Sequence, residues 1–261
     1  MNDINFIGKG LPLNNAGLEE TGRVLGINRA TIWAVLTVET RGCGFLHDRR
    51  PQILFERHVF HRITNGEYDT GNEEISHSLP GGYLGGTNEY SRLEKAMRLN
   101  QEAALKSTSW GIAQIMGFNF TAAGYATVDA MVRGFINDEN KQLQGMANFI
   151  NANNLANALV NADWRTFARG YNGSNYEKNQ YATRLAAAYA KAQTAPPNLA
   201  LRTAQIALWY LGINPGPIDG LRGRRTTSAL IQFQTTRHLP TTGELDQATE
   251  SALLAAAFPT D

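Results

Sequence analysis

The spacing of apolar residues along the chain predicts a protein built mainly from α-helices. Ile32, Val35 and Leu36 recur three and four residues apart within residues 28–40, which is the spacing of one helix face, and Gly42 follows the last turn. Further helices are predicted at residues 93–105, 128–151, 155–160 and 176–192, one short strand at residues 52–56, and a loop at the glycine-rich residues 80–86. We therefore expect a mainly helical fold with little sheet.

Two adjacent prolines divide the chain into a large and a small part. Pro196 and Pro197 follow an alanine-rich helical stretch, and because proline cannot continue a helix, they favour an extended connector. We place one domain at residues 1–193 and a second at residues 199–261. The second is short for an independent core, and its pattern predicts three helices separated by glycine and proline turns.

Composition and charge exclude several classes of protein. The 261 residues include 24 Lys and Arg and 23 Asp and Glu, so a net charge of +1 provides no overall field for a nucleic acid or a membrane surface. Cys43 is the single cysteine and can form no internal disulfide, which fits folding in a reducing compartment. No apolar stretch is long enough for a membrane span, and the first residues lack the features of a signal peptide. We expect no nucleic-acid partner and no membrane insertion.

Glu39 is the residue whose position points most directly to chemistry. It falls in register with the apolar residues 32–36, instead of on a polar helix face where a carboxylate stays hydrated. Burial disfavours the charged form of a carboxyl group and raises its pKa, which suits a general acid that works near neutral pH. The alternative is an ion pair with Arg41 or Arg57, and structural ion pairs outnumber catalytic acids.

Three segments in a fixed order resemble the catalytic segments of goose-type lysozymes and lytic transglycosylases. They are Trp33–Thr40 followed by Gly42, then Ser109–Gly117, then Arg169–Gly173. A further run, Arg50–Phe60, resembles the signature of the N-acetylmuramidase family found in phage endolysins, and the resemblance covers about residues 22–190. It implies a lysozyme-like domain of the goose-type or lytic transglycosylase-like class.

The resemblance implies roles for individual residues. Glu39 is implied to be the general acid of glycosidic cleavage. Neutral hydrogen-bonding side chains can fix a sugar without competing charge, and four are implied to line the glycan cleft: Ser109, Gln114, Tyr171 and Asn172. From the residues alone, Ser109 can equally cap a helix that begins at Trp110, and residues 171–173 can form an ordinary turn.

The second carboxylate is the open part of the mechanism. Glu56 lies inside the family signature and is the candidate, although its neighbour Arg57 makes a structural ion pair an equal alternative. The other carboxylates that could serve are Asp48, Glu73, Glu74 and Glu94. An inverting hydrolase holds a base or a water opposite the acid, whereas a retaining one needs a near nucleophile, and we favour inverting or water-mediated chemistry.

Several histidines lie in the same third of the chain as Cys43, but without a metal-binding spacing. They are His47, His58, His61 and His77, and no H-E-x-x-H or paired C-x-x-C motif accompanies them. We expect these side chains to pack or to form hydrogen bonds, and we expect neither a metal nor another cofactor.

The C-terminal domain resembles the common three-helix peptidoglycan-binding domain. The resemblance runs through Leu211–Gly223, Leu230–Gln234 and Leu239–Asp246, and it covers nearly all of residues 199–254. Leu230, Phe233 and Leu253 are predicted to form the core. The implied partners of the protein are the glycan strands and stem peptides of peptidoglycan.

Together these features predict a phage endolysin that lyses the host cell. We expect it to cleave the β-1,4 bond between N-acetylmuramic acid and N-acetylglucosamine with Glu39 as general acid. We also expect a monomer that stays in the host cytoplasm until a holin pore releases it to the cell wall and periplasm. Two alternatives remain: a lytic transglycosylase that forms 1,6-anhydro products, and a non-catalytic wall-binding virion protein.

Overall fold

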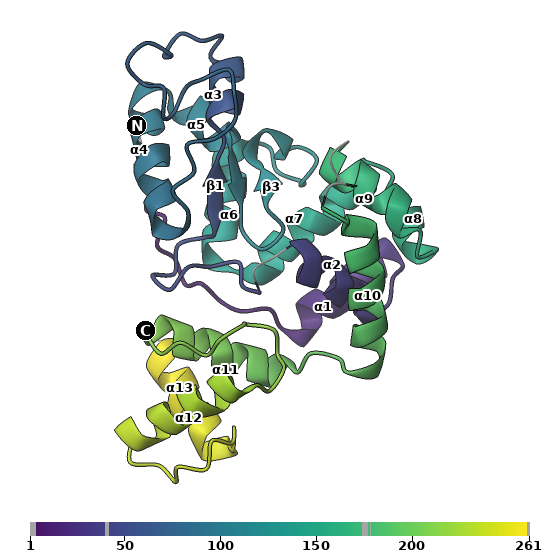
Figure 1. Cartoon of the computed structure of the whole chain (residues 1–261), viewed down its shortest axis with the longest axis vertical. Helices are drawn as coiled ribbons and strands as arrows, with labels where there is room; N and C mark the ends of the chain where they lie inside the picture. Colours follow the sequence, from purple (N-terminus) through teal and green to yellow (C-terminus); the bar gives the residue numbers. More distant parts are fainter. Residues whose placement is uncertain (1–3, 40–41, 174–176, 178, 260–261) are drawn as a thin grey trace.

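The structure of the chain is a computed structural model that describes residues 4–39, 42–173, 177 and 179–259, with Glu39 described in its backbone only. Figure 1 shows a larger part that ends with α10 and a small helical bundle below it. The helices of the larger part are α1 (Asn15–Leu25), α2 (Arg29–Glu39), α3 (Arg57–Ile63), α4 (Glu89–Leu99), α5 (Gln101–Lys106), α6 (Val128–Asn137), α7 (Glu139–Ala152), α8 (Ala156–Val160), α9 (Trp164–Asn172) and α10 (Tyr181–Thr194). Its strands are β1 (Ile53–Phe55), β2 (Thr108–Trp110) and β3 (Ile115–Met116), and the bundle holds α11 (Leu199–Tyr210), α12 (Arg224–Thr236) and α13 (Gln247–Ala257). The prediction of a mainly helical fold is confirmed.

The helix that ends at Glu39 lies inside the larger part. α2 packs along α10 and against α1, and the predicted apolar stripe at residues 32–36 is buried. At the end of the helix, the guanidinium of Arg184 on α10 donates a hydrogen bond of 3.2 Å to the carbonyl of Val38. A cation is favourable there because the carbonyl groups of a last helical turn carry partial negative charge. A side chain of α10 thus stabilises the last turn of α2.

A small antiparallel sheet has the strand order β1-β2-β3. Ser109 in the central strand pairs with Leu54 of β1 and with Met116 of β3. The interpretation of Ser109 as the cap of a helix beginning at Trp110 is therefore wrong. Strand β2 is buried on both faces and has only three residues, so it shows no alternation that would distinguish a strand from a helix. Gly111, with a φ of 68°, supplies the left-handed turn that leads into β3.

Two of the predicted helices are each interrupted by one polar residue. Residues 93–105 lie in α4 and α5, and residues 128–151 lie in α6 and α7. The breaks fall at Asn100 and Asp138, whose side chains accept backbone hydrogen bonds from the first turn of the helix that follows. These side chains compete with the helical hydrogen bonds of the backbone and favour a new helix start. The prediction of continuous helices is wrong at both positions. Of the helix predicted at residues 176–192, residues 176 and 178 lie outside the described residues, and α10 begins at Tyr181.

The small part is the predicted bundle of three helices. Leu230, Phe233 and Leu253 are buried at its centre, as expected. Two buried glutamines, Gln205 and Gln234, hold its turns, because each accepts a hydrogen bond of 2.8 Å from the backbone N–H of a turn glycine. The turns between the helices are therefore fixed from inside the bundle.

α11 packs on two sides. One side belongs to the core of the bundle, and the other faces the larger part, where Ile206 belongs to an apolar cluster with Cys43 and Phe45. At the end of the helix, the hydroxyl of Tyr210 donates a hydrogen bond of 2.8 Å to the carbonyl of Gly10. The small part is thus docked on the larger part as well as connected to it, as Figure 1 shows.

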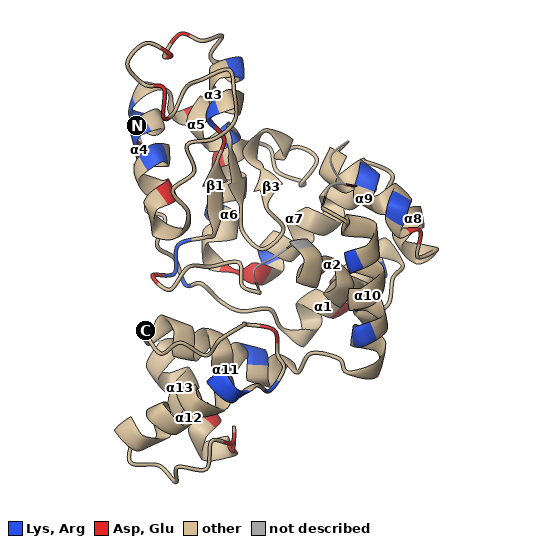
Figure 2. Cartoon of the chain, in the orientation of Figure 1, with Lys and Arg blue, Asp and Glu red and all other residues tan. Residues whose placement is uncertain are grey.

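Figure 2 shows Lys and Arg as well as Asp and Glu on the ribbons of both parts of the chain, in keeping with the net charge of +1. Among the described residues, every helix is too short or too polar to cross a lipid bilayer.

Candidate active site

Glu39 is the last residue of the buried helix α2. Its side chain lies outside the described residues, as do Thr40 and Arg41, so the sequence prediction for its carboxyl group stands as a prediction. Arg57, the other arginine considered as an ion-pair partner, donates to three backbone carbonyls within residues 73–80.

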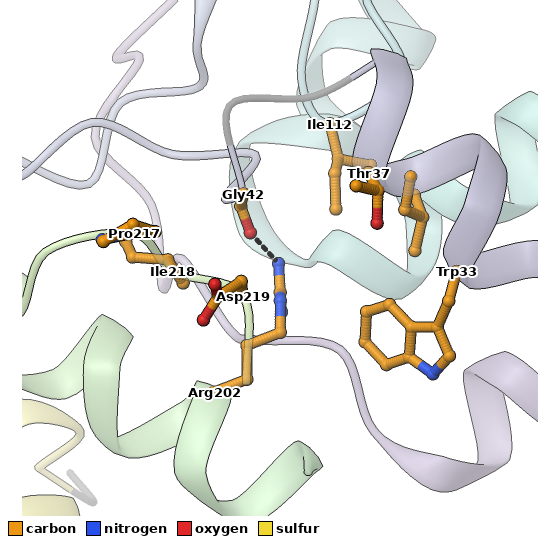
Figure 3. Close-up of a pocket in the computed structure, with 9 residues that line it drawn as sticks. Trp33, Thr37, Gly42, Ile112, Arg202, Pro217, Ile218 and Asp219 are labelled. Carbon is orange, nitrogen blue, oxygen red and sulfur yellow. Dashed lines mark hydrogen bonds between the residues drawn. The ribbon is translucent and has the colours of Figure 1, made fainter. Parts of the chain in front are cut away.

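The residues on both sides of Glu39 line a pocket. Thr37 precedes it in α2 and Gly42 follows it, and both share a pocket of about 250 Å³ with Ile112, which lies in the turn between β2 and β3 (Figure 3). Trp33 forms an apolar wall of this pocket and is almost completely buried. The end of α2 and the β2–β3 turn therefore face the same space.

Ser109 and Gln114 come together in the hairpin formed by β2 and β3. The hydroxyl of Ser109 donates a hydrogen bond of 2.9 Å to Oε1 of Gln114. The amide nitrogen of Gln114 donates to the carbonyls of Gly111 at 2.9 Å and Gln52 at 3.2 Å. Gln114 has a φ of 49°, a left-handed conformation that is uncommon for a residue other than glycine. Its side chain holds the hairpin turn in this shape.

Tyr171 and Asn172 form the end of α9. The hydroxyl of Tyr171 donates a hydrogen bond of 3.1 Å to the carbonyl of Ala113, in the same hairpin turn. The ring of Tyr171 stacks on Phe167 and meets the edge of Phe149. Both residues belong to helix α9, so the interpretation of residues 171–173 as an ordinary turn is wrong for residues 171 and 172. Of the four predicted cleft residues, Ser109, Gln114 and Tyr171 converge on one turn, and Asn172 follows directly.

Glu56 lies where β1 ends and α3 begins. Its carboxylate accepts a hydrogen bond of 2.8 Å from the hydroxyl of Tyr83. Nδ1 of His58 lies 3.2 Å from the same oxygen but without hydrogen-bond geometry, and this nitrogen is buried without a hydrogen-bond partner among the described residues. Burial and the nearby carboxylate of Glu56 raise the pKa of Tyr83 to about 12, so the phenol stays protonated and continues to donate.

Three of the other carboxylates considered for the second catalytic group are engaged elsewhere. Asp48 forms an ion pair with Arg50 at 2.7 Å, and Glu74 pairs with Lys95. Glu73 accepts a hydrogen bond from the backbone N–H of Gly71. The role of Glu56 as the second carboxylate stays a prediction.

Charged side chains form hydrogen bonds to the backbone of the loop at residues 79–86. Arg57 donates to the carbonyls at residues 79 and 80, and Arg92 donates to the carbonyl of Gly81. Glu89 accepts from the N–H groups of residues 84 and 85 and pairs with Arg92 at 2.8 Å. Burial alone would raise the pKa of Glu89, but these N–H groups and the charge of Arg92 outweigh it and lower the pKa. The loop forms a fixed rim.

A second pocket, of about 130 Å³, lies between this rim and the hairpin. Its lining includes Gln52, Gly85, Gly86, Gly111 and Gln114. Gln114 thus lies at a partly polar surface between two loops, and both of its amide N–H donors are used by the carbonyls of Gln52 and Gly111.

Sequence analysis missed the buried ion pair of Glu139 and Arg202. Arg202 on α11 donates two hydrogen bonds, of 2.7 and 2.9 Å, to the carboxylate of Glu139 at the start of α7. Burial alone would raise the pKa of Glu139, but the charge and hydrogen bonds of Arg202 outweigh it and lower the pKa. A signal was available, because α11 is apolar around most of its circumference, which is typical of a helix buried on two sides.

Comparison with known proteins agrees with this arrangement. Residues 28–193 match the N-acetylmuramidase family, and residues 198–253 match the peptidoglycan binding domain family. The chain belongs to the N-acetylmuramidase family. Among solved structures, the endolysin of Burkholderia AP3 phage is 37% identical, with 70% of this chain and 71% of that chain covered and a TM-score of 0.66. No curated protein matches the chain.

The family assignment makes this muramidase a glycoside hydrolase that acts on peptidoglycan, of the endolysin type. The resemblance inferred from the sequence segments and the predicted fold class are both confirmed. Peptidoglycan is its partner. The residue roles and the domain limits at 1–193 and 199–261 stay predictions.

The histidines of the muramidase form separate contacts. Nδ1 of His61 lies 2.8 Å from the carboxylate of Asp69, His77 accepts from the N–H of Leu79, and the ring of His47 meets that of Trp209 at its edge. Among the described residues, no three His, Cys, Asp or Glu side chains gather as a metal site would require. Burial raises the pKa of the Cys43 thiol, which keeps it protonated and unreactive.

Proposed function

We propose that this muramidase cleaves the β-1,4 bond between N-acetylmuramic acid and N-acetylglucosamine with Glu39 as general acid, and that it lyses the bacterial host of a phage. The observation that carries the proposal is the pocket shared by Thr37, Gly42 and Ile112. Residues on both sides of Glu39 face the hairpin turn there, so a sugar held at the hairpin would lie near the end of α2.

The surroundings of α2 favour a protonated acid. Trp33 and Leu36 are buried and apolar, and both line this pocket. In such surroundings the neutral form of a carboxyl group is favoured, which raises its pKa and keeps a proton available near neutral pH. The proton passes to the bridging oxygen as the bond to the muramic acid breaks.

The hairpin supplies the groups that would hold the sugar. Ser109 and Gln114 are already oriented by their mutual hydrogen bond, and Tyr171 anchors the same turn through Ala113. Because these groups are fixed before substrate binds, little conformational entropy is lost on binding. Asn172, at the end of α9, is proposed to contact the glycan from the neighbouring side.

Glu56 is the proposed second carboxylate. The hydrogen bond from Tyr83 fixes its orientation at the end of β1. A carboxylate held in this way can activate a water molecule for attack on the anomeric carbon, as an inverting mechanism requires. Tyr83 would then be the residue that orients the base.

The bundle of α11–α13 is proposed to hold the enzyme at the wall by binding glycan strands or stem peptides. The match of residues 198–253 to a peptidoglycan binding domain supports this role. A monomeric state, residence in the host cytoplasm before lysis, and release through a holin pore also belong to the proposal.

Replacement of the proposed acid tests the mechanism. Glu39→Gln keeps the size of the side chain but removes the proton donor, so lysis of purified walls should fall by about a hundredfold or more. Glu19→Gln, which changes an exposed glutamate on α1, is the matched control and should keep wild-type activity. A folded Glu39→Gln protein that lyses walls like the control would reject Glu39 as the acid.

A further inference from the structure

A buried arginine of the wall-binding bundle forms an ion pair with the catalytic part. Arg202 lies in α11 and is almost completely buried, as is its partner Glu139 in α7. The guanidinium donates two hydrogen bonds to the carboxylate, at 2.7 and 2.9 Å, in the fork geometry that arginine alone can make. The two residues come from opposite sides of the junction between the catalytic part and the bundle.

Arg202 also holds the backbone that follows α2. Its second terminal nitrogen donates a hydrogen bond of 2.6 Å to the carbonyl of Gly42, which Figure 3 shows as a dashed line. Gly42 lies three residues after Glu39. The contact therefore fixes the chain close to the proposed acid.

Glu139 holds the same segment from its other side. Its Oε1 atom accepts a hydrogen bond of 2.7 Å from the N–H of Gly44, and Oε2 accepts one of 2.8 Å from the N–H of Leu13. Arg202 and Glu139 thus fix the carbonyl of Gly42 and the N–H of Gly44, two residues apart. Gly44 leaves no room for a side chain, because a Cβ atom there would lie 2.0 Å from an oxygen of Gln142.

Docking of the bundle does not require a charged pair. Ile206 and Ile218 already pack against Cys43 and Phe45 across the junction, and apolar contacts of this kind hold two parts together without desolvating charges. A buried ion pair contributes little net stability, since the loss of hydration offsets the attraction. What a fork-shaped pair adds is a fixed geometry for the atoms it contacts.

We infer that Arg202 is a positioning residue of the active site: through it, the wall-binding bundle fixes the backbone at residues 42–44, which follow Glu39 closely in the chain, and so sets the placement of the acid. The inference rests on the proposed role of Glu39. The bundle then has two roles, because it also binds the wall. The rim of the pocket next to α2 agrees with this, since Ile218 and Asp219 of the bundle line it together with Thr37.

The full-length enzyme with Arg202→Lys or Arg202→Met tests the inference. Lysine keeps a positive charge beside Glu139 but cannot reach the carboxylate and Gly42 with the same fork, whereas methionine loses both contacts. The matched control is Tyr210→Phe, which removes another hydrogen bond from α11 to a carbonyl across the junction, that of Gly10. The substrate is a soluble, uncrosslinked glycan of alternating N-acetylglucosamine and N-acetylmuramic acid, and the release of reducing ends gives kcat and KM.

Both Arg202 variants should lose kcat by about tenfold or more with little change in KM, because a displacement of about 1 Å at a catalytic group can cost about a hundredfold in rate. Tyr210→Phe should keep the wild-type kcat, and all three variants should sediment with purified sacculi as the wild type does. A folded Arg202→Lys or Arg202→Met enzyme with the kcat of Tyr210→Phe would overturn the inference. A change in KM or in sedimentation alone would do the same, because it would assign Arg202 to wall binding.

If Arg202→Met does not fold, Arg202→Lys decides the question, because its lysine still compensates the charge of Glu139. An equal loss of kcat in Tyr210→Phe would also overturn the inference, since general loosening of the junction would then explain the effect. Failure of the proposed function is a separate result: it appears as an active Glu39→Gln enzyme, or as a wild type that releases no reducing ends.

Discussion

Ser109 donates its hydroxyl hydrogen to Oε1 of Gln114 over 2.9 Å, and the amide nitrogen of Gln114 donates in turn to the carbonyls of Gln52 and Gly111. A single side-chain amide therefore joins strand β2, the turn that follows it and the residue before β1. The same two side chains are proposed to line the glycan cleft.

Removal of the two donors of Gln114 should destabilise the protein more than removal of the Ser109 hydroxyl. Gln114→Glu places a carboxylate against two carbonyl oxygens, and leaving partly buried polar groups unsatisfied costs about 1–3 kcal/mol. Ser109→Ala removes one neutral hydrogen bond, worth about 1 kcal/mol. Urea denaturation of both variants gives the comparison, and an equal or reversed order would contradict the role of Gln114 as the residue that holds the turn.

Glu56→Gln should lower kcat on soluble glycan by about a hundredfold if the carboxylate acts as a base. The amide can still accept from Tyr83, so the fold around β1 should be kept. Tyr83→Phe, which removes only the orienting hydrogen bond, should have a smaller effect. Glu67→Gln, at an exposed position, is the control. Wild-type kcat in Glu56→Gln would make Glu56 a structural residue at the start of α3.

The ion pair of Glu139 should make stability depend on pH in a defined direction. Its pKa is lowered in the folded protein from an ordinary value of 4.5, so its contribution is present above about pH 4.5 and is lost as pH falls through the folded pKa. In Arg202→Met the charge that lowers the pKa of Glu139 is gone, and burial raises this pKa instead. The loss of unfolding free energy is therefore greatest at the pH values where Glu139 is charged.

Arg202→Met should therefore lose about 3–5 kcal/mol of unfolding free energy near pH 7, and clearly less near pH 4. Urea denaturation at the two pH values measures the difference, with Arg23→Met, from the exposed pair with Glu20, as the control. A loss that is the same at both pH values would show that Glu139 is not charged and buried in the variant.

Local periodicity was sufficient to predict the helix that ends at Glu39 and the helices of the bundle, but not α9, which carries Tyr171 and Asn172. The stripe at residues 32–36 is buried as expected, and Leu230, Phe233 and Leu253 form the core of the bundle. Both follow from the helical spacing of apolar residues, which depends on neighbours a few positions apart. Asn100 and Asp138 interrupt predicted helices because an Asn or Asp side chain can cap a new helix, and the apolar spacing continues across the break.

Contacts between distant residues could not be predicted in the same way. The two prolines indicated a connector, but they say nothing of whether the bundle docks, and the pair of Arg202 with Glu139 joins residues 63 positions apart. The convergence of Tyr171 on the turn of Gln114 likewise depends on how α9 packs on the hairpin. The resemblance to a family predicts that both residues line the cleft, whereas their spacing along the chain does not.

Mass spectrometry of peptidoglycan digested by the full-length enzyme tests the central claim most directly, with Glu39→Gln and Glu19→Gln digests beside it. The wild type and Glu19→Gln should release muropeptides that end in reducing N-acetylmuramic acid, and borohydride should convert these ends to the alcohol, whereas Glu39→Gln should release almost none. Products that end in a 1,6-anhydro sugar and resist borohydride would contradict hydrolysis, and products of the same kind and amount from Glu39→Gln would contradict the assignment of the acid.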